Sequence, residues 1–280
     1  MKRQLWVNLG LAVVVAALAW LVFLKPETPP DSALYQLSTL SATQIEEISI
    51  MPAHQPRIVL RKQQKSWFMT EPFSARADAL RVESLLGLLS AQSEKRIAAQ
   101  DLARFELDKP LGRVKLGAQE FVFGGAQPLS NQLYVLTQGA VYLISPVYFI
   151  DVAKPAPAFI SKQLLADEEV PVAFEFPRFA LKRENGTWQM TPPSNAPTQD
   201  SVNAFADEWR HALSNSVQPT ANFQSAAAVR VTFQSGKSVN VLFARDANDW
   251  LLLRDDGHLV YRFSAPGGKA LLEPMFAPKS

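Results

Sequence analysis

RIVLRKQQKSWFMTEP (Arg57–Pro72) and RFALKRENGTWQMTPP (Arg178–Pro193) are two stretches of the chain that follow one pattern. Each begins with Arg, carries Trp at its eleventh position and ends with Met-Thr-x-Pro. In both, apolar and polar residues alternate on either side of a polar centre, which is the period of half-buried strands. The second centre contains Asn185-Gly186, a pair that favours a tight hairpin because both residues accept positive φ. We therefore expect two β-hairpins, each with its Trp and Met on the inner face.

A helix is expected after each hairpin. Asp78 and Thr198 are good N-cap residues, because their side-chain oxygens accept from the first free backbone N–H groups. Apolar residues then recur at i, i+3, i+4 and i+7, the stripe of an amphipathic helix that packs on a sheet. The stripes are Val82, Leu85, Leu86 and Leu89 in the first copy, and Val202, Phe205, Ala206 and Trp209 in the second.

Short strand-like runs, separated by glycine-containing turns, complete each copy. They are 113–116, 120–123, 133–136 and 141–144 in the first copy and 230–233, 238–241, 250–253 and 259–262 in the second, with leading strands at 45–50 and 172–176. Because the same order of elements recurs, we interpret the body as a duplication. The predicted fold class is α+β, with two tandem, similar units of mostly antiparallel sheet and a packed helix, over residues 36–157 and 158–280.

The chain begins with a candidate membrane anchor. No charged residue occurs from Leu5 to Leu24, a length that at about 1.5 Å per residue spans the roughly 30 Å of a bilayer core. Lys2 and Arg3 precede it, so the positive-inside rule places the N-terminus in the cytoplasm and the body in the periplasm. We assign residues 1–24 to the tip and transmembrane helix, and 25–35 to a Pro-rich stalk. A cleaved signal peptide is the alternative, which the apolar run after Ala19 disfavours.

Composition excludes several functions. Hydrophobic residues form 48% of the chain, enough for a packed core. There is no cysteine, which removes disulfides, thiol catalysis and Cys-based zinc sites. The formal net charge of +2 equals the charge of Lys2 and Arg3, so the body is neutral. A neutral body lacks the positive field that nucleic-acid binding needs, and we expect no nucleic-acid partner.

No residue is predicted to be catalytic, to bind a cofactor or to hold a metal. His54, His211 and His258 lack a second ligand at metal-binding spacing, and we interpret them as surface or turn residues. The other candidate motifs are interpreted as turns. Asp246, Asp249, Asp255 and Asp256 do not have the spacing of a calcium-binding loop. Gly124-Gly125 lacks the spacing of a phosphate-binding loop, and Asn185-Gly186-Thr187 matches a glycosylation sequon but is explained by the Asn-Gly turn. The basic run Arg57, Arg61, Lys62 and Lys65 is interpreted as a solvated hairpin face, with anionic headgroups as the alternative partner.

Residues of the first copy resemble a bacterial family of membrane-anchored envelope proteins that is catalogued as a domain of unknown function. The resemblance rests on three features: a Trp before Thr-x-Pro, an Ala-Asp helix start and a Phe-x-Leu-Asp-x-Pro segment. In this chain they are formed by Trp67, Thr70 and Pro72, by Ala77 and Asp78, and by Phe105, Leu107, Asp108 and Pro110. Glu106 stands where the family commonly has Gly. The second copy lacks the Phe-x-Leu-Asp-x-Pro segment. The resemblance implies a single-pass protein facing the periplasm, often encoded beside ABC transporter components.

The expected function is therefore non-enzymatic. We expect an accessory or adaptor subunit, held in the inner membrane by residues 5–24, with an envelope protein as partner and an ABC-type transport complex as its implied setting. The alternative is a module that binds a lipid or glycan in a cleft between the copies, lined by rings such as Tyr134, Tyr142 and Trp250.

Overall fold

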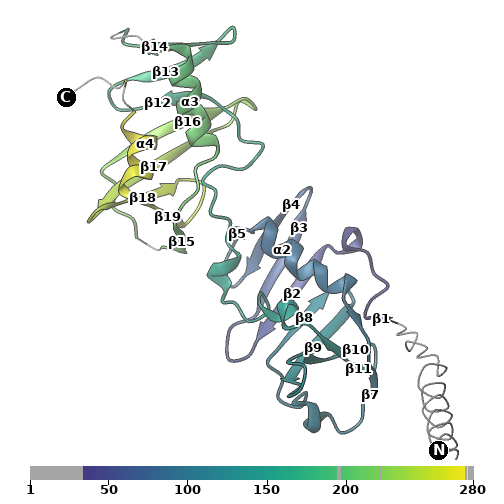
Figure 1. Ribbon diagram of the computed structural model, residues 1–280. Coiled ribbons are helices and arrows are strands. Elements are labelled where there is room, and N and C mark those ends of the chain that lie inside the picture. Colours follow the sequence, from purple (N-terminus) through teal and green to yellow (C-terminus); the bar gives the residue numbers. More distant parts are fainter. Residues whose placement is uncertain (1–33, 194–196, 221, 275, 277–280) are drawn as a thin grey trace, which may run out of the picture.

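The computed structural model describes residues 34–193, 197–220, 222–274 and 276, and it contains two large β-sheets joined by one connection (Figure 1). Every strand pair is antiparallel, and helices pack on both sheets. The predicted class, α+β with mostly antiparallel pairing, is confirmed. We call residues 34–158 unit 1, residues 159–164 the connecting segment and residues 165–276 unit 2.

Unit 1 contains a nine-stranded sheet in the order β5-β4-β3-β2-β8-β9-β10-β11-β7. Its strands are β2 (Glu47–Pro52), β3 (Ile58–Gln63), β4 (Ser66–Glu71), β5 (Ala75–Arg76), β7 (Arg96–Ala98), β8 (Gly112–Leu116), β9 (Gln119–Ala126), β10 (Leu133–Thr137) and β11 (Ala140–Ile144). A small separate sheet pairs β1 (Tyr35–Gln36) with β6 (Gln92–Ser93). The first predicted hairpin is β3–β4, in which Gln63 pairs with Ser66 across the turn.

Unit 2 contains an eight-stranded sheet in the order β14-β13-β12-β16-β17-β18-β19-β15. Its strands are β12 (Pro171–Glu175), β13 (Ala180–Glu184), β14 (Thr187–Thr191), β15 (Ser216–Pro219), β16 (Ala227–Phe233), β17 (Ser238–Asp246), β18 (Asp249–Arg254) and β19 (Leu259–Phe263). The second predicted hairpin is β13–β14. Its turn residues Asn185 and Gly186 have φ of 49° and 85°, the left-handed conformation that this pair favours.

The strand orders of the two sheets correspond, except that unit 1 has the additional edge strand β5. In each sheet the hairpin is followed by the leading strand, then by four strands that form a meander, and last by a short strand that comes after the helix in sequence. The predicted strands are thus present in the predicted order. The origin of this order by duplication stays a prediction.

The two predicted helices begin where the sequence indicated, and they are α2 (Ala79–Leu86) and α3 (Gln199–Arg210). A third helix, α4 (Ala265–Leu272), was not predicted. The 3-10 turns are η1 (Ala42–Gln44), η2 (Gly87–Ser90), η3 (Leu102–Phe105), η4 (Pro146–Phe149) and η5 (Ala156–Phe159). Asp78 caps α2 by accepting from the N–H of Arg81, and Thr198 caps α3 by accepting from the N–H of Ser201, both at 3.2 Å. Figure 1 shows α2 lying across the sheet of unit 1, and α3 packing beside α4 on unit 2.

The two tryptophans of the repeated hairpins differ in burial, although the sequence predicted the same inner position for both. Trp188 is 5% exposed, whereas Trp67 is half-buried and packs at the border of the core. The difference arises at the start of the helices. The Gln199 side chain accepts from the N–H of Trp188 and donates to its carbonyl, and the indole Nε1 donates to Asn203 Oδ1 at 3.0 Å. The first residue of α2 is Ala79, which has no such polar side chain.

The expected anchor at residues 5–24 and most of the expected stalk lie outside the described residues. Among the helices that the structure describes, none is both long enough and apolar enough to cross a membrane.

The segment that carries Phe-x-Leu-Asp-x-Pro folds onto strand β9. Phe105 and Leu107 are buried in a second, smaller apolar cluster with Val122 and Val141. A Cβ on Gly124 would lie 2.2 Å from the carbonyl oxygen of Phe105, so glycine is what allows this close contact. Glu106, between the two buried residues, has φ of 57° in the left-handed region.

Replacing Glu106 by glycine should stabilise the protein by about 0.5–1 kcal/mol. An L-residue in the left-handed region is strained by roughly 1–2 kcal/mol, of which glycine recovers a part after its own loss of backbone entropy. Urea unfolding curves measure the difference. The matched control is Glu208→Gly in α3, which should lower stability by about 1 kcal/mol because that backbone is helical. Equal destabilisation by both replacements would contradict the assigned backbone of Glu106.

Candidate functional site

The connecting segment between the units is held by backbone hydrogen bonds from both sides. On the side of unit 1, the N–H of Asp78 donates to the carbonyl of Phe159, and the N–H of Ser161 donates to the carbonyl of Arg76, both at 2.8 Å. Ala77 and Ile160 form an isolated β-bridge between these bonds. Residues 159–161 therefore extend the edge of unit 1 beyond β5.

Unit 2 holds the following three residues in the same manner. The N–H of Ser214 donates to the carbonyl of Lys162, and the N–H of Leu164 donates to the carbonyl of Ala212, both at 2.9 Å. Gln163 and Leu213 form the β-bridge here. The chain thus changes from the edge of one sheet to the edge of the other at the peptide between Ser161 and Lys162.

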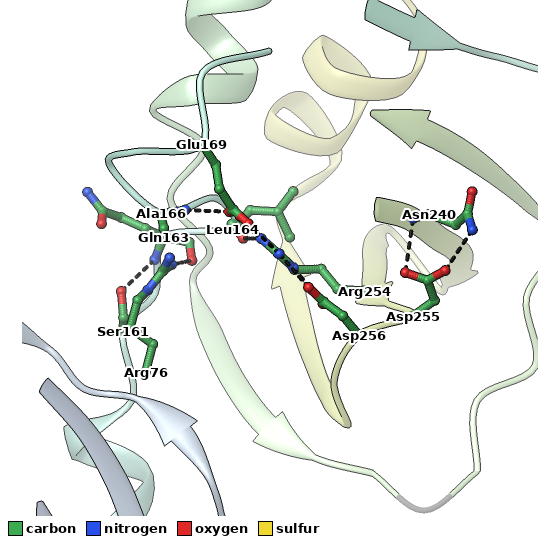
Figure 2. Close-up of polar contacts among 10 residues, drawn as sticks. All are labelled: Arg76, Ser161, Gln163, Leu164, Ala166, Glu169, Asn240, Arg254, Asp255 and Asp256. Carbon is green, nitrogen blue, oxygen red and sulfur yellow. Dashed lines mark hydrogen bonds and ion pairs between the residues drawn. The ribbon is translucent and has the colours of Figure 1, made fainter. Parts of the chain in front are cut away.

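Two arginines, one from each unit, donate to consecutive carbonyl oxygens of the connecting segment (Figure 2). Arg76, at the end of β5, donates through Nη2 to Gln163. Arg254, at the end of β18, donates through Nη1 to Leu164 at 3.0 Å. The site is therefore built from the last residue of a strand in each sheet.

All three guanidinium nitrogens of Arg254 donate hydrogen bonds. It contacts both carboxylate oxygens of Glu169 at 2.6 and 2.7 Å, and both oxygens of Asp256 at 2.9 and 2.7 Å. Burial alone would lower the pKa of Arg254, but these charged hydrogen bonds outweigh it and raise the pKa. Burial would likewise raise the pKa of Glu169, yet the Arg254 guanidinium and the N–H of Ala166 hold it below its ordinary value. Hydrogen bonding to Arg254 also lowers the pKa of Asp256, against opposing desolvation.

The guanidinium of Arg76 is only partly hydrogen-bonded. Its Nε atom is buried and has no hydrogen-bond partner, in contrast to the donors of Arg254 that point at carboxylates. Its positive charge is close enough to Glu169 and Asp256 to contribute to their lowered pKa values. An unpaired donor in a buried place is uncommon in folded proteins and calls for a physical explanation.

A cleft of about 430 Å³ lies between the units beside these groups. Its walls combine apolar side chains with charged and hydroxyl groups from both sheets. They are formed by Phe68, Ser74, Ala75, Arg76, Leu164, Ala166, Glu168, Glu169, Arg254, Asp256, Gly257, His258, Leu259 and Tyr261. Burial raises the pKa of the Tyr261 hydroxyl, so it is a neutral hydrogen-bonding group in the cleft wall.

A second hollow, of about 540 Å³, lies on unit 1 around Gln119. The Gln119 amide donates to the Leu37 carbonyl at 2.7 Å and to Thr137 Oγ1 at 2.9 Å, and it accepts from Ser38 Oγ at 2.7 Å. Its side chain is therefore satisfied within the fold. We take the cleft between the units as the candidate site, because residues of both units line it together with Arg76, whose buried Nε is unpaired.

The histidines occupy turn and helix-end positions, as the sequence indicated, with one addition. His54 has φ of 59° in an exposed turn, and a ring nitrogen of His211 lies 3.0 Å from the carbonyl of Asp207 at the end of α3. His258 lines the cleft, where its ring meets the edge of Phe73 at a centroid distance of 6.3 Å. Among the described residues, no group of three His, Asp or Glu side chains is arranged to hold a metal ion.

The acidic residues of unit 2 lie in two hairpin turns, as interpreted from the sequence. Asp246 and Asp249 both pair with Arg262, at 2.6 and 3.1 Å, across the β17–β18 turn. Asp255 accepts from the N–H and the side-chain amide of Asn240. Of these four aspartates, Asp256 lines the cleft, where it binds Arg254. The sequence did not indicate this position, because the other carboxylate of the cluster, Glu169, is distant in the chain.

The three aromatic rings expected along a cleft lie elsewhere. Tyr142 and Trp250 are 4% and 6% exposed in the core, and Tyr134 packs on Phe105 with ring centroids 4.8 Å apart. None of them lines the cleft between the units. Alternating burial along each strand directed these rings into the sheet packing.

The basic run of the first hairpin is exposed and partly paired on its own sheet. Arg61 contacts Glu47 at 3.0 Å, and Arg57 donates to Ser49 Oγ at 3.0 Å. Such pairs on an exposed strand face agree with a solvated hairpin surface.

Comparison with known families identifies the chain. The family model described as "Domain of unknown function (DUF4340)" matches residues 67–239. The chain belongs to this family. No curated protein and no solved structure matches it. The matched region of this DUF4340 protein begins in β4 and ends in β17, so it includes the connecting segment and parts of both sheets.

Replacing Glu169 by glutamine should reduce stability by about 2 kcal/mol at pH 7, because Arg254 loses a charged partner in a mostly buried place. The folded state holds the pKa values of Glu169 and Asp256 below ordinary values. Their contribution to stability is therefore present at neutral pH and is lost as the pH falls through about pH 4 and below. Urea unfolding at pH 7 and pH 3.5 should show a smaller acid-induced loss for the variant than for wild type.

The neighbouring Glu168 provides the control, because it is exposed beside the same cleft. Glu168→Gln should keep the wild-type acid dependence and change stability by less than about 0.5 kcal/mol. Identical pH profiles for all three proteins would contradict the role assigned to the Arg254 cluster.

Proposed function

We propose that this DUF4340 protein is a non-enzymatic accessory or adaptor subunit of a bacterial envelope complex. In this proposal residues 5–24 anchor it in the inner membrane with its N-terminus in the cytoplasm, and the two-unit body contacts an envelope protein in the periplasm. An ABC-type transport complex is the setting that the family resemblance implies. We also propose that the two units arose by duplication, which the corresponding strand orders support.

The observation that carries the proposal is the uneven distribution of exposed apolar side chains. Of nine large hydrophobic residues that are exposed in the described part of the chain, eight belong to unit 1. Five of them lie at one end of its sheet, which we call the apolar end: Met51, Leu111, Leu129, Val147 and Ile150. Leu129 is 96% exposed.

The strand register brings these five residues to the same end. Pro52 pairs with Gly112, Gly112 pairs with Phe123, and Leu133 pairs with both Ala126 and Ile144. The loops that follow β2, β9 and β11 and the loop before β8 therefore emerge together. A group of exposed apolar residues on one part of a soluble body marks an interaction site, because burying it against a partner is favourable by about 25 cal/mol per Å².

Site-specific photocrosslinking in intact cells tests this proposal. A photoreactive phenylalanine analogue placed at Leu129 or at Val147 should form a covalent adduct with another envelope protein, identified by mass spectrometry. The same group at Lys237, an exposed turn of unit 2, serves as the control. Ile150→Asp should reduce the adducts by placing a charge in the contact. Absence of an envelope partner, or equal adducts from Lys237, would refute the proposed contact.

A second candidate function is binding of a lipid or glycan, which the cleft between the units supports. Its walls contain apolar side chains beside neutral hydroxyl groups such as those of Ser74 and Tyr261. Native mass spectrometry of the full chain with phosphatidylglycerol and with maltotetraose tests it. Ala166→Trp should fill the cleft and abolish any specific adduct, and an adduct that survives this change would place the ligand elsewhere.

A further inference from the structure

Contacts across the junction of the two units are few. Residues 159–161 are hydrogen-bonded to unit 1, and residues 162–164 are hydrogen-bonded to unit 2. Within the described part of the chain, two hydrogen bonds cross from residues 34–161 to residues 162–276. Arg76 donates to the carbonyl of Gln163, and the N–H of Gln163 donates to Ser161 Oγ at 3.4 Å (Figure 2). The edge contact between Phe73 and the exposed His258 is a further crossing contact.

The two arginine contacts differ in strength. Arg254 donates to Leu164 and is itself fixed by Glu169 and Asp256, which belong to the same unit. Leu164 therefore moves with unit 2. Arg76 gains one charge-assisted hydrogen bond across the junction, but it leaves its buried Nε without a partner. The contact of Arg76 therefore stabilises the closed arrangement, but by less than a fully paired arginine would.

We propose that the two units move as rigid bodies about the peptide between Ser161 and Lys162, and that Arg76 is the latch that holds the cleft between them closed. Hinges are a few residues between packed elements that absorb a change of backbone angles, and this peptide is where the hydrogen-bonding partners change. When the contact of Arg76 with Gln163 breaks, its Nε becomes accessible to water and the cleft widens. The proposal does not depend on the adaptor role.

Distance measurements between spin labels test the hinge, and the chain has no native cysteine to interfere. One label pair joins Lys65→Cys with Lys237→Cys, and a second joins Lys109→Cys with Lys237→Cys. All three positions are exposed turns or loops. Double electron–electron resonance is recorded on the full chain in detergent micelles. With Arg76 present, each pair should give one main distance.

Replacing Arg76 by methionine removes the latch while keeping a long apolar side chain. We expect the width of at least one distance distribution to double or more, with a second population appearing. Arg76→Lys retains a donor for the Gln163 carbonyl and should restore the main distance. Arg61→Met, an exposed arginine that pairs with Glu47 within unit 1, is the matched control and should leave both distributions unchanged.

Circular dichroism and thermal melting establish that the Arg76→Met protein is folded before it is measured. Distributions that are identical with and without Arg76 would overturn the latch. A distribution that is already as broad in the protein with Arg76 as in Arg76→Met would also overturn it, because the units would then move without any latch.

Discussion

Gly268→Ala should destabilise the protein by about 3 kcal/mol, which is large for the addition of one methyl group. Gly268 lies in α4, where the helix crosses strand β18. A Cβ at this position would be 2.1 Å from Cδ1 and 2.3 Å from Cγ of Trp250. The indole has no room to withdraw, because Phe243 packs on it at 5.9 Å and the Arg245 guanidinium lies 4.1 Å from the ring centroid.

The adjacent glycine in the same helix is the control. A Cβ on Gly267 would meet its nearest neighbour, Ser264 Oγ, at an ordinary 3.4 Å. Because alanine favours the helix over glycine by about 1 kcal/mol, Gly267→Ala should leave stability unchanged or raise it slightly. Thermal melting of the two variants decides the matter, and equal melting temperatures would show that α4 does not lie against Trp250.

Trp188→Ala should lower the free energy of unfolding by about 3–5 kcal/mol, whereas Trp67→Ala should lower it by only about 1–2 kcal/mol. The Trp188 ring is buried, stacks on Phe174 at 5.9 Å and donates to Asn203. Its removal leaves a large cavity under α3. Trp67 occupies the equivalent place in the first hairpin but is half-buried, so less apolar area is lost.

Urea unfolding of both variants tests this difference. Asn203→Ala, measured beside them, separates the hydrogen bond from the packing and should account for about 1 kcal/mol of the loss at Trp188. Equal effects at Trp67 and Trp188 would show that the two hairpins are covered alike, as the sequence alone suggested.

The elements of the fold could be predicted because they depend on local patterns. Alternation around Asn185-Gly186 indicated a hairpin, and a capping residue followed by a 3.6-residue stripe indicated each helix. The structure confirms both hairpins, both caps and every predicted strand of the two sheets. It adds α4, which the sequence reading missed because Gly267 and Gly268 are poor helix formers.

A cleft between the copies was expected in the alternative function, but the residues that form the candidate site were not predicted. Arg76, Glu169 and Arg254 lie far apart in sequence, and none belongs to a recognisable motif. Their meeting depends on how two sheet edges share the connecting segment, and such long-range contacts leave no periodic signal in the chain. The burial of Trp250 had the same origin, because it follows from the close approach of α4 at Gly268.

Sequence alone was sufficient for the two hairpins, for the type and order of the main strands and for the starting points of α2 and α3, since backbone propensity and side-chain period act over neighbouring residues. Tertiary structure alone decided that Trp188 is buried and Trp67 is not, that Arg254 binds two carboxylates, and that Arg76 keeps an unpaired Nε. These outcomes are set by side-chain contacts between helix and sheet and by the junction of the sheets, where residues distant in the chain compete for the same space and the same hydrogen bonds.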